Sequence, residues 1–323
     1  MPEFPRIIFF GTPDFAVASL AKLIDSGYSV VAVVTSPDKQ AGRGLKEKTS
    51  AVKDFAVLHG IPVLQPLNMK DPGFTELLSS YKPDLQIVIA FRMMPKQVWS
   101  LPPLGTFNLH ASLLPQYRGA APINRAVING EKETGVTTFF LNEQIDTGKI
   151  ILSEKLAIGN DETAGELHDR LMNTGANLVL ATVERIVSGK VDEISQEALT
   201  GDPANLKPAP KIFKDDCRID WNHDVQTIHD FVRGLSPYPG AYTELKLKDG
   251  SVQQLKVFRV VPEQILTHEV PGHFVTDGKS YLKVSAKNGF IFLEDVQLSG
   301  RKAMTSGDFL RGFGRIFPET RAI

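Results

Sequence analysis

Asn108 and His110 are the residues of this chain whose types and spacing best suit chemistry. They lie two positions apart in the stretch FNLHASLLPQYRGAAPINRAV, residues 107–127. In a strand, both side chains would point to one face while Phe107 and Leu109 point to the other. An asparagine amide donates hydrogen bonds and cannot ionise, whereas a histidine near neutral pH can donate from one ring nitrogen and accept at the other. Together they could hold an oxyanion and manage a proton.

Asp146 is the carboxylate expected to complete this pair. It lies in NEQIDTGKI, after an apolar segment and before a Thr-Gly turn. Chemistry of this kind usually needs a carboxylate to orient the imidazole or to take up the proton. Each of the three residues alone is more often a hydrogen-bonded histidine, a cap or a turn residue. The combination of NLH at a strand end, SLLPQYRGAAP after it and DTG about one strand later favours a site.

The elements expected around these residues place them at one edge of a sheet. Apolar runs alternate with helical patterns, which is typical of a parallel α/β sheet. The strands are expected at residues 6–10, 28–35, 61–63, 84–90, 106–110 and 134–141, and the helices at residues 15–23, 50–59, 122–129 and 162–188. In such sheets sites form at the carboxyl ends of the strands, and the break at residues 111–115 ends the strand of Asn108 and His110. The pair therefore lies where a substrate would bind.

The last third of the chain has a different texture. Residues 199–211, LTGDPANLKPAPK, are rich in proline and small polar residues, as linkers are. Beyond them, short alternating segments at residues 241–247, 255–261, 281–285 and 289–298 are separated by Gly, Asp and Asn turns, which indicates a small, mainly β domain. We predict a catalytic domain at residues 1–198, a linker at 199–211 and the β domain at 212–323. The predicted fold is a Rossmann-like, parallel-sheet α/β domain followed by a small OB-like β-barrel.

Composition narrows the function classes. The chain has 323 residues, 42% of them hydrophobic, and a formal net charge of -1, which argues against a uniformly basic nucleic-acid binder. Cys217 is its one cysteine, so an internal disulfide or a cysteine metal cluster is excluded. The N-terminal apolar run is far shorter than a membrane span and has no signal-peptide pattern. We expect a cytoplasmic protein.

Taken together, the motifs resemble those of the folate-dependent formyltransferase family. The stretch that contains Asn108 and His110, followed by GVTTFFLNEQIDTGKI, is similar to the family's Asn, His, SLLP and Asp-Thr-Gly signature. FFGTPDFAVASL, SPDKQAGRGLK, ETAGELHDRL and GLSPYPGAYTEL are similar to the branch that formylates tRNA, so the resemblance covers nearly the whole chain. It implies transfer of a formyl group from 10-formyltetrahydrofolate, the donor substrate, to the methionine amine of initiator methionyl-tRNA, for translation initiation.

The resemblance also implies roles for individual residues. Asn108 and His110 would hold the tetrahedral oxyanion, and Asp146 would orient His110 and help to remove the amine proton, the final holder of which stays open. The implied folate-binding residues are Ser112, Leu113, Leu114, Pro115, Phe91 and Met93.

Residues 36–53, SPDKQAGRGLKEKTSAVK, are expected to form a basic, flexible loop. Composition alone favours a solvated surface loop, because charge runs usually need no partner. The resemblance implies instead that this loop enters the acceptor end of the tRNA, with contacts from Arg43, Lys39, Lys46 and Lys48. Such side chains clamp phosphates without reading sequence.

Three other functions compete with this interpretation. An N-formyltransferase acting on an amino sugar nucleotide would share Asn108, His110 and Asp146, but it needs neither the AGRGLK loop nor the β domain. A dinucleotide-binding dehydrogenase is disfavoured because Gly11 lacks the later glycines of G-x-G-x-x-G. An RNA-binding module with a decayed enzyme domain is disfavoured by the intact set of three residues. The other histidines show no metal-ligand spacing, so we expect no metal, and we expect a monomer.

Overall fold

The computed structural model describes residues 4–41, 46–246, 251–313 and 321–322, and it divides into two compact units. The first unit comprises residues 1–120, 133–157 and 168–209, and the second comprises residues 121–132, 158–167 and 210–323. Two short internal segments therefore cluster with the C-terminal residues. The domain boundaries predicted at residues 198 and 212 place a single cut in the chain, and they stay a prediction.

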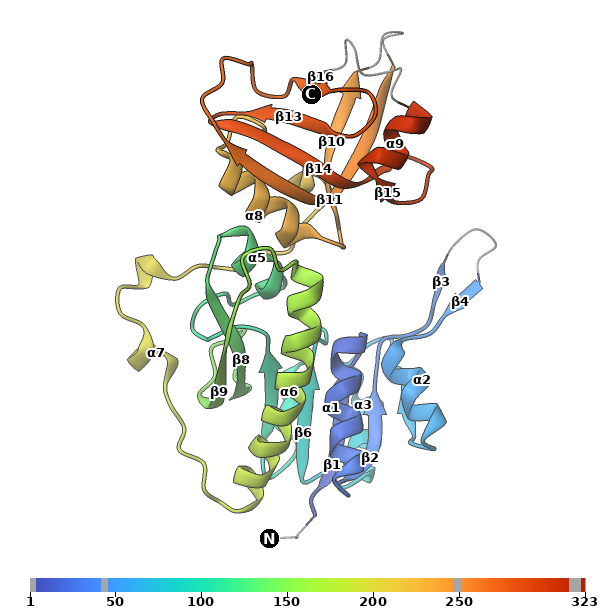
Figure 1. The fold of residues 1–323 in the computed structure, drawn as a ribbon. Helices are drawn as coiled ribbons and strands as arrows, with labels where there is room; N and C mark the ends of the chain where they lie inside the picture. Colours follow the sequence, from blue (N-terminus) through green and yellow to red (C-terminus); the bar gives the residue numbers. More distant parts are fainter. Residues whose placement is uncertain (1–3, 42–45, 247–250, 314–320, 323) are drawn as a thin grey trace. The chain divides into compact units, whose positions relative to one another are not determined.

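The first unit is built on a seven-stranded sheet (Figure 1). In spatial order its strands are β5 (Val63–Leu64), β2 (Ser29–Val34), β1 (Arg6–Gly11), β6 (Leu85–Ile89), β7 (Thr106–His110), β8 (Glu133–Phe140) and β9 (Ile150–Ala157). The strands from β5 to β7 pair in parallel, which confirms the predicted α/β fold. The last two strands, β8 and β9, instead pair antiparallel. Helix α5 (Pro122–Ile128) separates β7 from β8 in the sequence and belongs to the second unit, so it is no crossover helix of this sheet.

The first unit also contains helices. They are α1 (Asp14–Asp25), α2 (Ala51–Leu58), α3 (Pro72–Ser80), α4 (Lys96–Trp99), α6 (Ala164–Val187) and α7 (Gln196–Leu199), with a 3₁₀ turn at Pro203–Asn205. The residues of α3 and α4 pack against Ile8 and Phe10 in one core cluster. Helix α6 crosses close to β7, because a Cβ added at Gly175 would lie 2.7 Å from the Leu109 side chain. The Leu109 side of β7 is therefore the side covered by α6.

Local capping explains where several helices begin. Ser50 caps α2 by accepting from the Lys53 amide at 3.1 Å, and Asp71 precedes the Pro72 that opens α3. The helix expected to begin at residue 162 has its N-terminal cap at Thr163 and Glu166. Thr163 accepts from the Glu166 amide, and the Glu166 carboxylate accepts from the Thr163 amide at 2.8 Å. The Thr163 amide and hydroxyl both donate to the Glu166 carboxylate, and these two hydrogen bonds lower the pKa of Glu166.

The second unit is an antiparallel β domain. Its strands lie in the order β12 (Phe274–Thr276), β13 (Leu282–Ala286), β14 (Gly289–Leu298), β11 (Val252–Gln264), β10 (Ala241–Lys246) and β16 (Arg321–Ala322), with β15 (Met304–Thr305) beside β14. The β domain is thus confirmed, and β14 has its predicted bounds. The helices α8 (Val225–Leu235) and α9 (Ser306–Phe313), and a 3₁₀ turn at Asp215–Cys217, were not expected.

Helix α8 carries a buried ionic network inside the second unit. Arg233 is 3% exposed and donates to Asp230 at 2.7 Å and to the carbonyl oxygen of Glu162 at 2.9 Å. Burial alone would raise the pKa of Asp230, but hydrogen bonds from His229, Gln226 and Arg233 hold that pKa below its usual value. The network ties residues 158–167 to the β domain.

Among the described residues, no helix has the length and apolar character that spanning a membrane requires.

Candidate active site

Strand β7 presents Asn108 and His110 on the face opposite α6. Leu109 points toward α6, so its two neighbours in the strand point to the other side of the sheet. The Asn108 side chain is half-buried, and His110 is 7% exposed. Among the residues that the structure describes, none forms a hydrogen bond with the Asn108 amide. That amide is therefore free to meet a ligand.

His110 is oriented by the main chain. Its Nε2 atom lies 2.8 Å from the carbonyl oxygen of Tyr117. A carbonyl oxygen only accepts hydrogen bonds, so Nε2 must carry the hydrogen. The other ring nitrogen, Nδ1, is then the one that a neutral His110 offers as an acceptor.

Asp146 faces this second nitrogen across a gap. Its Oδ2 atom lies 3.9 Å from His110 Nδ1, which is too long for a direct hydrogen bond. The same oxygen accepts from the Gly119 amide at 3.0 Å. The sequence suggested that Asp146 orients His110. In the structure the orienting hydrogen bond goes to Tyr117, and Asp146 supplies a negative charge near Nδ1.

Unusual backbone conformations gather around these groups. Within the described part of the chain, four residues other than glycine have positive φ, and three of them are Ala90 (47°), Tyr117 (59°) and Asp146 (55°). Ala90 follows β6, the neighbour of β7, while Tyr117 and Asp146 make the contacts just described. Such conformations cost about 1–3 kcal/mol each and cluster at functional sites. Their concentration here independently supports the site.

A later segment of the chain holds the turn that contains Tyr117. We call residues 194–209 the strap. The Tyr117 amide donates to the carbonyl oxygen of Lys207 at 2.7 Å, and the Ala209 amide donates to that of Arg118 at 2.8 Å. The proline-rich composition of residues 199–211 suggested a linker, but residues 207–209 pair with the site. Nothing in that composition signals the pairing, because it uses main-chain groups.

The predicted folate-binding residues around Pro115 are largely engaged within their own loop. The Ser112 hydroxyl donates to the carbonyl oxygen of Gln116 at 2.6 Å. Thr137 of β8 donates to the Ser112 carbonyl oxygen at 2.7 Å and accepts from the Leu114 amide at 3.2 Å. Ser112, Leu114 and Pro115 are buried, and Leu113 is half-buried. Contact with a ligand through this loop would therefore depend on its shape rather than on the serine hydroxyl.

Two other predicted folate-binding residues follow β6. Phe91 packs edge-on against Phe10 with ring centroids 5.7 Å apart, and Met93 is 74% exposed. The intervening Arg92 donates to the carbonyl oxygens of Pro66 and Leu67. The guanidinium is thus engaged by another loop, while the Met93 side chain is available for contact.

Part of the basic segment at residues 36–53 forms paired strands instead of the expected loop. Strands β3 (Lys39–Ala41) and β4 (Lys46–Lys48) pair antiparallel, with Lys39 opposite Lys48, so the expectation of a flexible loop is wrong for these residues. The side chains of Lys39 and Lys48 are exposed. Arg43 and the Lys46 side chain lie outside the described residues.

Asp38 anchors the start of this hairpin. Its carboxylate forms an ion pair with Lys53 and accepts from the Gln65 amide at 2.9 Å. The hydrogen bond from Lys53, followed by that from Gln65, lowers the pKa of Asp38. The residue that precedes β3 is therefore tied to α2 and to the segment that follows β5.

Comparison with known proteins decides the family. A family model described as formyl transferase matches residues 5–183, and one described as formyl transferase, C-terminal domain, matches residues 211–314. The methionyl-tRNA formyltransferase of Parabacteroides distasonis is 56% identical over 313 residues, which is 96% of each chain. Those of Azobacteroides pseudotrichonymphae and Porphyromonas gingivalis (strain W83) are 53% and 47% identical, each over 95% of both chains. The chain belongs to the methionyl-tRNA formyltransferase family.

Solved structures share the fold at lower sequence identity. HypX from Aquifex aeolicus, in complex with tetrahydrofolic acid, has a TM-score of 0.65 at 18% identity and covers 95% of this chain, which spans 47% of that one. The sugar 3N-formyltransferase WlaRD, with a TM-score of 0.63 at 19% identity, covers 93% of this chain and is itself covered completely. These likenesses show the fold alone. The relatives named methionyl-tRNA formyltransferase decide the family, and the sugar enzymes are distant neighbours.

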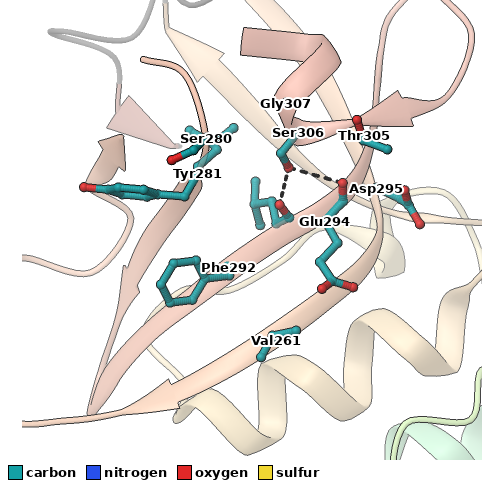
Figure 2. Close-up of a pocket in the computed structure, with 11 residues that line it drawn as sticks. Val261, Ser280, Tyr281, Phe292, Glu294, Asp295, Thr305, Ser306 and Gly307 are labelled. Carbon is teal, nitrogen blue, oxygen red and sulfur yellow. Dashed lines mark hydrogen bonds between the residues drawn. The ribbon is translucent and has the colours of Figure 1, made fainter. Parts of the chain in front are cut away.

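A separate pocket of about 600 Å³ lies in the β domain of this formyltransferase (Figure 2). Figure 2 shows Tyr281 and Phe292 on one side and Glu294, Asp295 and Ser306 on the other. The Ser306 hydroxyl is engaged with the carbonyl oxygens of Leu293 and Glu294. The lining combines carboxylates with aromatic and apolar groups and contains no imidazole. Acid–base chemistry is therefore better supported at His110.

Proposed function

We propose that this chain transfers the formyl group of 10-formyltetrahydrofolate to the α-amino group of methionine on initiator tRNA. The observation that carries the proposed mechanism is the arrangement at β7. A free Asn108 amide shares a strand face with His110, the Nδ1 of which points across 3.9 Å to Asp146. The roles that follow are part of this proposal.

Asn108 stabilises the charge that develops on the formyl oxygen. The methionine amine attacks the formyl carbon, and the carbonyl oxygen becomes an oxyanion in the tetrahedral intermediate. An amide N–H placed in advance stabilises such an oxygen, and removal of one such donor costs about 10²- to 10³-fold in rate. Asn108 suits this role because no residue in the described part of the chain forms a hydrogen bond with its amide.

His110 moves the proton. With Nε2–H held by Tyr117, the neutral ring accepts the amine proton at Nδ1. The resulting imidazolium donates a hydrogen bond from Nδ1 to the oxyanion. When the oxyanion re-forms the carbonyl group and the carbon–N10 bond breaks, the imidazolium transfers this proton to N10 of the folate. The products are formyl-methionyl-tRNA and tetrahydrofolate, so the proton count balances.

Asp146 stabilises the imidazolium during this cycle. A carboxylate 3.9 Å from Nδ1 favours the charged ring electrostatically, and the Gly119 amide holds the carboxylate in place. The gap leaves Nδ1 free to reach the reacting atoms. Asp146 thus acts through charge rather than through a hydrogen bond to the ring.

The tRNA is bound in this proposal by the basic hairpin and the β domain. Lys39 and Lys48 are exposed on paired strands and can clamp phosphates. In the sequence Arg43 lies between these two lysines, and we propose that it contacts the tRNA with them. We place the reaction in the cytoplasm, where the initiator tRNA is used.

The test is transfer of a labelled formyl group by the purified chain. Methionine-charged initiator tRNA is compared with charged elongator tRNA, free methionine and an amino sugar nucleotide as acceptors. We expect transfer to the initiator tRNA, with at most slow transfer to the others. Transfer confined to the amino sugar nucleotide, or no transfer to any acceptor, would overturn the proposal.

A further inference from the structure

We infer that Gln196 is a positioning residue of the formyl-transfer site. It holds two backbone segments at a fixed separation: the turn that contains Tyr117, the hydrogen-bond partner of His110, and the loop that contains Asp146. The inference rests on the proposed function. Gln196 lies in the strap at the start of α7 and is 2% exposed. No feature of its sequence context marked it as part of the site.

The Gln196 side chain is fully used. Its Nε2 donates to the carbonyl oxygen of Asp146 at 2.9 Å and to that of Gly148 at 2.8 Å. Its Oε1 accepts from Arg118 twice, from Nε at 3.0 Å and from an Nη atom at 2.6 Å. An amide has two donor hydrogens and two acceptor lone pairs, and all four are occupied here. A buried amide satisfied in this way specifies one arrangement of the groups around it.

The groups it joins are those that hold the catalytic pair. Arg118 stands between Tyr117, the carbonyl of which orients His110, and Gly119, the amide of which holds the Asp146 carboxylate. Gln196 therefore connects the turn at residues 117–119 with the loop at residues 146–148 through its side-chain amide. If the link is lost, the Gly119–Asp146 hydrogen bond is the one that still joins these two segments among the hydrogen bonds described above.

The strap itself is anchored on the sheet, so Gln196 is a rigid link. Ile194 and Ile150 exchange two main-chain hydrogen bonds, of 2.8 Å and 2.9 Å, just before α7. At the other end, the Lys207 and Ala209 main chains pair with residues 117–120. Both ends of the strap thus fix the side chain relative to the site.

Two variants and one matched control test the inference. Gln196→Leu removes all four hydrogen bonds. Gln196→Glu keeps the volume and the pairing with Arg118 but places a carboxylate against two carbonyl oxygens, so it breaks only the link to the Asp146 loop. The control is Gln86→Leu. Gln86 is a fully buried glutamine of β6, and its Nε2 has no hydrogen-bond partner among the described residues. Its partner Thr106 retains a hydrogen bond to Trp99.

The measurements are single-turnover formyl transfer over a range of pH, KM for each substrate, and urea unfolding. We expect both Gln196 variants to lower kcat by roughly 10- to 100-fold, because displacement of a reacting group by about 1 Å costs about that much. KM for both substrates should change less than about 3-fold, and the pH dependence of kcat should change because Asp146 then sits at a different distance from Nδ1. Gln86→Leu should retain kcat and the wild-type pH dependence.

A double-mutant cycle in kcat separates loss of positioning from loss of stability. Arg118→Met removes the partner of Oε1, so combining it with Gln196→Leu should lower kcat no further than the larger single loss. The inference is overturned if either folded Gln196 variant keeps kcat at the level of Gln86→Leu, or if only KM rises. Should Gln196→Leu fail to fold, Gln196→Glu decides. An inactive wild-type chain would instead refute the proposed function.

Discussion

A single methyl group added at position 119 should push the turn at residues 117–119 away from the strap. A Cβ built on Gly119 would lie 2.4 Å from the carbonyl oxygen of Ala209 and 2.9 Å from its carbon. These are main-chain atoms of the strap, which cannot rotate aside as a side chain can. Gly119 also has φ +127°, a conformation that L-residues rarely adopt. Gly119→Ala must therefore push the turn and the strap apart.

The size of the effect follows from these contacts. The backbone strain alone costs about 1–3 kcal/mol. Separation of the strap weakens the Tyr117–Lys207, Arg118–Ala209 and Ala120–Ala209 main-chain hydrogen bonds, each worth about 1 kcal/mol. We expect a total loss of about 3–5 kcal/mol in the free energy of unfolding. Because the Gly119 amide also holds Asp146, single-turnover formyl transfer should fall about 100-fold.

Urea unfolding and single-turnover transfer measure both effects, and a second glycine supplies the control. Gly27 has φ +82° and nothing within 4 Å of an added Cβ, so Gly27→Ala introduces strain without a clash. It should lose about 1–2 kcal/mol and keep its turnover. If Gly119→Ala matches Gly27→Ala in both assays, the strap does not position the site and the reasoning is refuted.

Four further predictions follow from the same structure. Asn108→Ala should lower kcat by about 10²- to 10³-fold without changing the urea midpoint, and near-normal turnover would remove Asn108 from the catalytic set. Replacing Lys39 and Lys48 together with Gln should weaken tRNA binding and reduce the slope of log K against log salt by up to about two, without changing folate binding measured by titration. Arg233→Met should cost about 3–5 kcal/mol in urea unfolding, because it strands the buried Asp230 carboxylate, and a loss below about 1 kcal/mol would contradict this. The pKa of Asp230 is lower in the folded chain than the ordinary 3.8, so its stabilisation is present above that pH and is lost as pH falls through the folded pKa. Asp230→Asn should therefore flatten the acid side of the stability profile, and an unchanged acid limb would refute that assignment.

The elements that could be predicted are those in which one local signal dominates. Strand β7 at Thr106–His110 and strand β14 at Gly289–Leu298 have their predicted bounds, because apolar residues end at clear turn residues on both sides. Helix α6 begins within two residues of the predicted start, where the capping box lies. The catalytic candidates were recognisable for the same reason, because polar residue types stand out at the end of a buried strand.

Among the elements that were missed, helices α8 and α9 have a helical pattern that other residue types obscure. Helix α8 has apolar residues at helical spacing, but its buried side also carries His229, Asp230 and Arg233, which disguise the pattern. Helix α9 contains Gly307 and Gly312, which weaken helix propensity. The antiparallel direction of β8 is equally invisible locally, since a strand has the same period in both directions.

The site differs from the fold in what a sequence can reveal about it. Asn108, His110 and Asp146 are visible in the sequence because the proposed chemistry depends on their side-chain types. The groups that hold His110 and Asp146 in place are main-chain atoms of Tyr117 and Gly119, and the strap pairs with this turn. Every residue has a carbonyl oxygen, and every residue except proline has an N–H, so such contacts leave almost no signature in residue type. Residue type reveals such a contact only where the main-chain arrangement restricts which side chain can occupy a position. Gly119 is required by close approach, and Gln196 is required by two carbonyl oxygens and a guanidinium that one amide must bridge. Substitutions at positions 119 and 196 therefore test how the backbone builds the site, while substitutions at the catalytic residues test the chemistry alone.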